Sequence, residues 1–268
     1  MKFLAAAIQM LASEDKEANL REAEAGIRDA ASRGAKVVAL PEVFNWRGAK
    51  AEEKRNAEPI PGPTADLMAL LARNLHIYLL AGSFLEQIPE VEKCYNTSLF
   101  FGPDGNLLAR YRKIHLFDVA IEGGVSVLES ETRQPGEEVA MAETELGRMG
   151  LTVCYDLRFP ELYRALVSKG AEIIFVPAAF TALTGEAHWE PLLRARAIEN
   201  QVYVIAPDQI GHNPKSFATY GNSMIVDPWG RILARALDMP GVIVAEIDLA
   251  YLQKVRRELP ALAHRKLP

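Results

Sequence analysis

Short apolar runs recur along the chain, separated by stretches in which apolar residues fall at helical spacing. The runs predict strands, because a strand covered on both faces is apolar at nearly every position. The expected strands are 2–10, 37–40, 77–85, 95–101, 107–112, 139–144, 149–153, 173–177, 202–207, 223–226, 232–236 and 242–247. The amphipathic stretches predict helices over 15–33, 64–74, 160–169, 189–200 and 249–258.

The residues at the ends of these segments agree with the predicted boundaries. Asp15 and Thr64 are suited to cap the first two helices, and Gly34 and Gly170 are suited to end two of them before a strand begins. This recurring order of helix, glycine and strand is typical of an α/β protein. Four polar stretches predict loops: 45–63, which is expected to lie over a site, and 120–134, 181–188 and 211–221.

The chain shows no linker, repeat or low-complexity segment, so we expect one domain over 1–268, with 259–268 as a tail. The formal charge of −5 gives no reason to expect nucleic acid or an anionic membrane as a partner. The first apolar run is short and is followed by Gln9 and Glu14, unlike a secretory signal. The cysteines, Cys94 and Cys154, form no disulfide framework, which favours the cytoplasm.

The sequence predicts neither a metal site nor a cofactor. The five histidines are scattered, without a pair at the spacing of metal ligands, and there is no Cys-x-x-Cys motif. There is also no glycine-rich phosphate loop after a predicted strand, which argues against a nucleotide cofactor.

One stretch, from Gly150 to Leu162, places a thiol at the end of a buried strand. Cys154 follows the strand 149–153, and a helix is expected to open at Pro160. A nucleophile at a strand end is held rigidly and still faces the edge of the sheet. The alternative is that Cys154 is a small buried apolar residue. The stretch alone does not separate the two.

A nucleophilic thiol needs a group that takes its proton. His115, His188 and His212 lie in predicted loops, and spacing selects none of them. Glu42 follows the strand 37–40 and is the carboxylate alternative, although its position alone favours a solvated loop acid. For Lys113, which ends a basic cluster, composition favours a solvated basic edge.

The order of three motifs along the chain indicates a protein family, which position and composition alone do not. The motifs are Leu40-Pro41-Glu42, then Tyr111-Arg112-Lys113-Ile114-His115-Leu116, then Val153-Cys154-Tyr155-Asp156-Leu157-Arg158-Phe159-Pro160-Glu161. In this order and at these separations they resemble the nitrilase superfamily of carbon–nitrogen hydrolases. The resemblance implies a four-layer α-β-β-α sandwich and a homodimer or higher homo-oligomer.

The resemblance also implies the roles of individual residues. Glu42 would be the general base, Lys113 the cationic stabiliser and Cys154 the nucleophile, and the family's second glutamate matches Glu129. The backbone N–H of Tyr155 would join Lys113 in holding the oxyanion. The expected reaction is amide hydrolysis through a thioester, without a cofactor.

Within the family, three segments resemble amidases of deaminated glutathione and ω-amidases of 2-oxo acids: 184–190, 194–199 and 220–230. Deaminated glutathione is the expected substrate. The alternatives are 2-oxoglutaramate, a broader aliphatic amide or nitrile, or a catalytically inactive binding module. Three residues depart from the family pattern in or beside loops expected to border the pocket, namely Glu122, Glu186 and Asn222.

Such a substrate carries carboxylates, so a basic side chain should meet it. Arg158 follows the nucleophile closely, although pairing with Asp156 or Glu161 would explain it equally well. Arg47 and Lys215 are further candidates in loops. The other expected substrate contacts are Phe180, Thr184 and His188.

Overall fold

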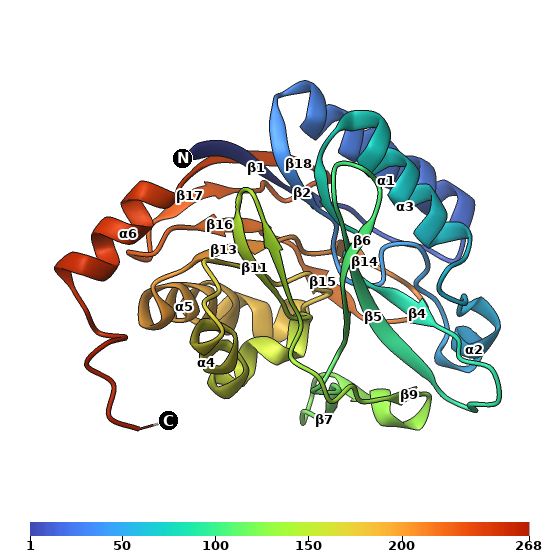
Figure 1. Cartoon of the computed structure of the whole chain (residues 1–268). Helices are drawn as coiled ribbons and strands as arrows, with labels where there is room; N and C mark the ends of the chain where they lie inside the picture. Colours follow the sequence, from blue (N-terminus) through green and yellow to red (C-terminus); the bar gives the residue numbers. More distant parts are fainter. Residues whose placement is uncertain (268) are drawn as a thin grey trace.

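The computed structural model describes residues 1–267 and contains two β-sheets packed face to face, with helices on both outer faces (Figure 1). The helices are α1 (Lys16–Ser32), α2 (Glu53–Asn56), α3 (Pro63–Leu75), α4 (Pro160–Ser168), α5 (Ala182–Asn200) and α6 (Leu249–Glu258). Helices α1 and α3 cover one sheet, and α4 and α5 cover the other. The predicted α/β class and its four-layer sandwich are confirmed.

The first sheet has the strand order β18-β1-β2-β3-β5-β4, with β6 and β9 also paired to β5. Its strands are β1 (Lys2–Gln9), β2 (Ala35–Ala39), β3 (Tyr78–Leu80), β4 (Phe84–Glu86), β5 (Cys94–Phe101), β6 (Leu107–Arg112), β9 (Arg133–Gln134) and β18 (Gly241–Asp248). Strands β1, β2 and β3 run parallel. Their carboxyl ends therefore lie at one edge, where β2 leads directly to Pro41 and Glu42.

The second sheet has the order β10-β11-β12-β13-β16-β17. Its strands are β10 (Met141–Thr144), β11 (Gly147–Leu151), β12 (Ile173–Phe175), β13 (Tyr203–Ala206), β16 (Met224–Val226) and β17 (Ile232–Arg235). Strands β11, β12 and β13 are parallel. The thiol of Cys154 follows β11, so both sheets deliver a candidate site residue just beyond a parallel strand.

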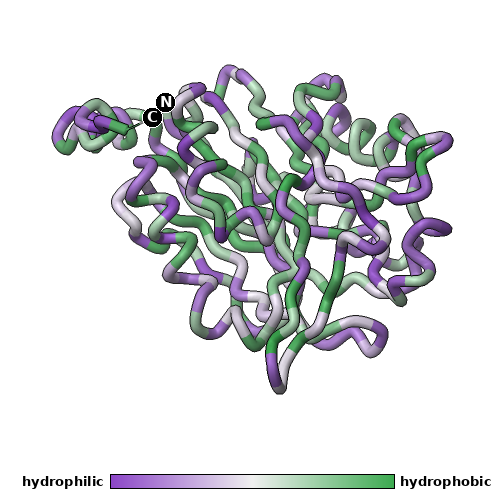
Figure 2. Tube along the Cα trace, turned by 90° about the horizontal axis from the view of Figure 1, so that it is seen from below, coloured by the Kyte–Doolittle hydropathy of each residue, from purple (hydrophilic) through white to green (hydrophobic). Residues whose placement is uncertain are grey.

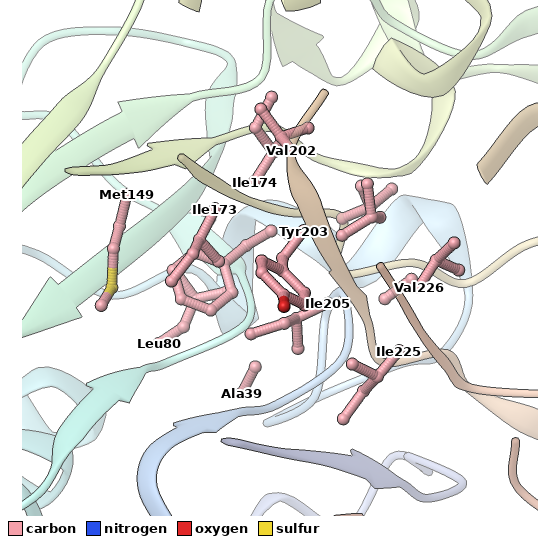
Figure 3. Close-up of a cluster of buried hydrophobic side chains, with 14 of the residues drawn as sticks. Ala39, Leu80, Met149, Ile173, Ile174, Val202, Tyr203, Ile205, Ile225 and Val226 are labelled. Atoms are coloured by element: carbon pink, nitrogen blue, oxygen red, sulfur yellow. The ribbon is translucent and has the colours of Figure 1, made fainter. Parts of the chain in front are cut away.

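The apolar character of β1 follows from burial on both of its faces. Ala5 and Ala7 join the core between the sheets, whereas Ala6 and Ile8 pack under α1 and α3. In the core between the sheets, Figure 3 shows Leu80 of the first sheet close to residues of the second. Seen from below in Figure 2, the hydrophobic residues follow the inner strands and the hydrophilic ones are commonest on outer helices and loops.

Several elements differ from those predicted. The segment 181–188 is the start of α5, because Gly185 lets the helix approach Tyr220 so closely that a Cβ would overlap the ring. Loop 211–221 contains the hairpin of β14 (Ile210–His212) and β15 (Ala218–Tyr220). Loop 120–134 contains most of the hairpin of β7 (Asp118–Ala120) and β8 (Ser126–Leu128), and then β9.

Helix α3 begins one residue earlier than expected, at Pro63, so Thr64 is not its cap and instead donates its backbone N–H to Glu58. The predicted strand 77–85 is divided into β3 and β4 by a bend at Gly82. Within residues 1–267, no helix is long and apolar enough to cross a membrane.

The bend at Gly82 supports the segment that carries Glu42, and this makes it testable. Gly82 has φ +35, and a Cβ there would overlap the backbone carbonyl oxygen of Pro41. Gly82→Ala is expected to cost more than about 1 kcal/mol of unfolding free energy, because backbone atoms must move. Gly241→Ala is the control, since a Cβ there meets open space. Equal melting temperatures for the two variants would contradict this account.

Candidate active site

Glu42 is held in place by hydrogen bonds to both carboxylate oxygens. Its Oε1 accepts from Lys113 Nζ at 2.8 Å and from Asn96 Nδ2 at 2.8 Å, and its Oε2 accepts from the backbone N–H of Ala179 at 2.9 Å. The backbone is fixed as well, because the Glu42 carbonyl accepts from Gln209 Nε2. Glu42 is buried and therefore is not the solvated loop acid that position alone allowed.

Lys113 is the cation of the site. It follows β6, is 1% exposed, and its ammonium group lies between two carboxylates, Glu42 and Glu129. The distances from Nζ are 2.8 Å to Glu42 Oε1 and 2.9 Å to Glu129 Oε2. The solvated basic edge is thus ruled out for Lys113, although its neighbour Arg110 fits that description.

Glu129 is fixed more firmly than a surface acid would be. Besides Lys113, it accepts from Arg133 Nη1 at 2.6 Å and from the backbone N–H of Phe117 at 2.8 Å. Arg133 in turn pairs with Glu53 of α2 at 2.6 Å. The result is a buried chain of alternating charges that runs from Glu42 to Glu53.

Cys154 opens a tight turn, η3 (Cys154–Arg158), and has the positive φ of 49°. The turn is locked by Asp156, whose carboxylate accepts from the backbone N–H of Val153 and from the hydroxyl of Tyr111. The backbone N–H of Cys154 donates to the Pro177 carbonyl at 2.9 Å. This left-handed conformation directs the chain away from β11 so that the thiol lines a pocket with Glu42 and Lys113.

The charges in this pocket set the protonation of its groups. Burial, followed by the negative charge of Glu42, raises the pKa of the Cys154 thiol well above its usual value, although Lys113 opposes the change. Burial alone would lower the pKa of Lys113, but Glu129 and Glu42 raise it instead. Burial would likewise raise the pKa of Glu129, yet Lys113 and Arg133 hold it low. The resting site therefore contains a neutral thiol beside a permanent ammonium.

Two cavities meet at these residues. The catalytic pocket, about 20 Å³, is lined by Cys154, Lys113 and Tyr155 among others. The second, which we call the chamber, has a volume of about 480 Å³ and is lined by Trp46, Arg47 and other residues of 43–53 and 124–133. The residues that line both are Glu42, Glu129, Ala179 and Phe217. The predicted loop 45–63 thus borders the site, as expected.

Three of the four residues expected to contact the substrate lie together in the catalytic pocket. Arg158, Phe180 and Thr184 line the catalytic pocket, whereas His188 is outside it and contacts Arg158 at 3.2 Å. Among residues 1–267, Arg158 forms no ion pair with Asp156 or Glu161, and its guanidinium instead lies 5.1 Å from the centre of the Phe180 ring. The alternative of structural pairing for Arg158 is therefore wrong.

The histidines occupy other positions. His115 Nδ1 lies 2.7 Å from Asp156 Oδ1, and its ring stacks on Phe159, so it serves the turn rather than the thiol. His212 lies in the exposed β14–β15 hairpin. The three departures from the family pattern lie, as expected, in or beside segments that border the cavities (120–134, 181–188 and 211–221), but Glu122, Glu186 and Asn222 themselves line neither cavity. Asn222 instead accepts from Arg235 and Trp189.

Several contributors to the site were not predicted. Asn96 and Arg133 bind the two glutamates, and Phe117 and Phe217 form aromatic walls. Asn96 had a signal, because it is a polar residue in an otherwise buried strand. Arg133 had one too, since it stands four residues after Glu129.

A family model described as carbon-nitrogen hydrolase matches residues 4–257. The chain belongs to this family. It is 45% identical over 266 residues to a deaminated glutathione amidase of Synechocystis, covering 98% of each chain. It is 40% identical over 264 residues to human omega-amidase NIT2, covering 98% of this chain and 95% of that one. The family confirms a hydrolase that acts on carbon–nitrogen bonds.

Solved structures agree. The crystal structure of Saccharomyces cerevisiae Nit3, a member of branch 10 of the nitrilase superfamily, has a TM-score of 0.90 at 35% identity and covers 99% of this chain and 97% of that one. A mutant amidase from Nesterenkonia has a TM-score of 0.80 at 26% identity, with 96% and 95% covered. That structure shows the acetamide moiety of fluoroacetamide added covalently at the active site cysteine.

The buried pairing of Glu129 predicts a dependence of stability on pH. Its pKa in the folded state lies below the value of about 4.3 expected on unfolding, so its stabilisation is complete above that pH and is lost as pH falls through the folded pKa. Glu129→Gln is expected to cost about 3–5 kcal/mol near neutral pH. The difference in unfolding free energy between wild type and variant should become smaller as the pH falls from about 5 to about 3.

Denaturant unfolding followed by circular dichroism at a series of pH values measures this difference. Glu131→Gln is the control, because Glu131 is largely exposed and pairs with Lys50 at the surface. A difference for Glu129→Gln that stays constant with pH would show that the carboxylate is not held ionised by Lys113 and Arg133.

Proposed function

We propose that the chain is a cysteine-dependent amidase that cleaves a small carboxylated amide, most readily deaminated glutathione, through a thioester. The observation that carries the proposal is the Lys113 ammonium, held between Glu42 and Glu129 in the pocket that Cys154 lines. An ammonium fixed in a water-poor pocket beside a thiol is suited to stabilise the oxyanion of acyl transfer.

The first half of the proposed reaction forms the thioester. Because the Cys154 thiol is neutral at rest, Glu42 takes its proton as the sulfur attacks the amide carbonyl carbon. The carbonyl oxygen becomes an oxyanion that accepts from the Lys113 ammonium and the backbone N–H of Tyr155. Glu42 then gives the proton to the leaving nitrogen, the carbon–nitrogen bond breaks, and ammonia or an amine departs.

The second half consumes one water. Glu42 takes a proton from this water as its oxygen attacks the thioester carbon, and the same oxyanion contacts hold the second intermediate. The carbon–sulfur bond breaks, the proton returns to the Cys154 sulfur, and the carboxylic acid is released. Glu129, ionised by its two cations, orients the amide nitrogen and the Lys113 ammonium.

The substrate part of the proposal is supported by the relatives and by the site. Both named activities concern amides of a 2-oxo acid, and the 45% identity to a deaminated glutathione amidase favours the larger one. Arg158, Phe180 and Thr184 would contact the substrate in the catalytic pocket, and His188 would orient Arg158. The ω-amidase activity on 2-oxoglutaramate is the second candidate, supported by the 40% identity to human omega-amidase NIT2.

The proposal includes a cytoplasmic location and a homodimer. Both cysteines are free, and a thiol nucleophile must stay reduced to act. Several large apolar side chains are exposed, including Trp229 before β17 and Leu237 and Met239 after it. Sedimentation equilibrium should give a mass near twice the 29.6 kDa of one chain. A mass of 29.6 kDa at micromolar concentration would contradict the homodimer.

The substrate is tested by a common product. Hydrolysis of deaminated glutathione and of 2-oxoglutaramate both release 2-oxoglutarate, so one coupled assay compares them. We expect a higher kcat/KM for deaminated glutathione, and loss of at least about 1,000-fold of either activity in Cys154→Ala, which has no nucleophile. Cys94→Ala is the matched control, because Cys94 is buried and free but lies outside the catalytic pocket.

Three results would change the proposal. A preference for 2-oxoglutaramate would retain the mechanism and replace the substrate. Equal losses in Cys94→Ala and Cys154→Ala would remove Cys154 as the nucleophile. No release from either amide or from a simple aliphatic amide would favour a catalytically inactive binding module.

A further inference from the structure

The chamber contains a cation that the reaction above does not use. Arg47 follows the Glu42 segment, is 5% exposed and lines the chamber. One side of its guanidinium is held, because Nη2 donates to the Phe217 carbonyl at 2.7 Å and to Ser216 Oγ at 3.3 Å. The group also lies 4.7 Å from the centre of the Phe217 ring.

The other side of the guanidinium is unpartnered. Arg47 Nη1 is buried and has no hydrogen-bond acceptor among residues 1–267, and no carboxylate in that range forms an ion pair with Arg47. A buried donor left unpaired costs about 1–3 kcal/mol, more for a charged group. Burial lowers the pKa of Arg47 to about 10, so the group is still charged at neutral pH.

Nearby acids do not neutralise Arg47. Asp208 is buried, burial followed by the charge of Glu42 raises its pKa well above the usual value, and among residues 1–267 it forms no ion pair with Arg47. Glu42 and Glu129 are already engaged by Lys113. The remaining acid of the chamber, Glu53, pairs with Arg133.

The other cations at the chamber differ from Arg47. Lys215 pairs with Glu14, and Lys50 pairs with Glu131, and both lysine side chains are more than one third exposed. They lie at the rim of the chamber, where water screens their charge. Arg47 is therefore the cation whose free donor most needs an anionic acceptor from a ligand.

We infer that Arg47 binds a substrate carboxylate in the chamber, at a distance from the amide that is cleaved. This rests on the proposed function and specifies its substrate class: amides that carry a carboxylate away from the scissile bond. The chamber meets the catalytic pocket at Glu42 and Glu129, so one molecule can occupy both. Its volume of about 480 Å³ falls within the usual range of small-ligand sites.

The carboxylate could come from either side of the amide. The acyl side of both candidate substrates ends in a 2-oxo acid, whereas the departing cysteinylglycine of deaminated glutathione ends in a glycine carboxylate. The chemistry recognised by Arg47 is the same, and a planar guanidinium suits either carboxylate. Substrates that differ in these groups separate the two sources.

The test compares three amides in wild type and in Arg47→Met. They are deaminated glutathione, 2-oxoglutaramate and 4-oxopentanamide, which is 2-oxoglutaramate with a methyl group in place of its carboxylate. We expect the ratio of kcat/KM for deaminated glutathione to that for 4-oxopentanamide to fall by about 10- to 100-fold in the variant, mainly through KM. A purely structural role would lower all three values together.

The behaviour of 2-oxoglutaramate identifies the carboxylate. If Arg47→Met lowers the kcat/KM ratio of 2-oxoglutaramate to 4-oxopentanamide as much as it lowers that of deaminated glutathione to 4-oxopentanamide, Arg47 binds the 2-oxo acid. If the ratio for 2-oxoglutaramate is unchanged, Arg47 binds the glycine carboxylate. Arg256→Met is the matched control, because Arg256 also donates to backbone carbonyls, of Gln201 and Ala171, and lies outside both cavities. It should leave both ratios as in wild type.

Arg47→Lys keeps the positive charge, and it keeps the test informative if Arg47→Met does not fold. It should recover part of the lost ratio, because an ammonium still attracts a carboxylate but lacks the fork of two donors. If both kcat/KM ratios change by less than about 3-fold in both Arg47 variants, the inference is overturned. The proposed function would still stand in that case, provided that the wild-type enzyme cleaves the carboxylated amides. A wild type that cleaves none of the three amides would overturn both.

Discussion

The ammonium of Lys113, buried between Glu42 and Glu129, is the constraint around which the site is built. A buried ion is expensive to desolvate, and it is tolerated only where opposite charges and hydrogen bonds surround it. Here three carboxylates and two cations alternate from Glu42 to Glu53. Each comes from a different segment, so the segments after β2 and β6, the turn η2 (Glu129–Glu131), β9 and α2 must all be in position together.

The same charges divide the chemical work between the two glutamates. Glu129 is bound by two cations and a backbone N–H, so it is a fixed anion that positions its neighbours. Glu42 adjoins the thiol, and its charge helps to keep that thiol neutral. A neutral nucleophile beside a carboxylate needs only a short proton transfer to become reactive.

The sequence predicted those parts that depend on strand periodicity and on local motifs. The apolar runs located most strands, since a strand covered on both faces leaves a continuous apolar signature. Glu42, Lys113 and Cys154 each follow such a strand, but their roles were predicted from the resemblance of the three motifs to the nitrilase superfamily. Segment 181–188 was misjudged because Gly185 is a poor helix former by itself, and only its packing against Tyr220 gives it a reason to be there.

Long-range pairing explains what local patterns missed. Arg133 meets Glu53 from 80 positions away, and Arg47 meets Phe217 from 170 positions away. Local hydrophobic periodicity cannot predict contacts between residues so far apart in the sequence. These residues line the chamber and come from loops, from β9 and from α2, whereas Glu42, Lys113 and Cys154 stand just beyond strands. In the proposed function, the residues just beyond the strands would carry out the chemistry, and the chamber would determine which amide is bound. The three departures in this chain fit that division, since none of them reaches the buried charges.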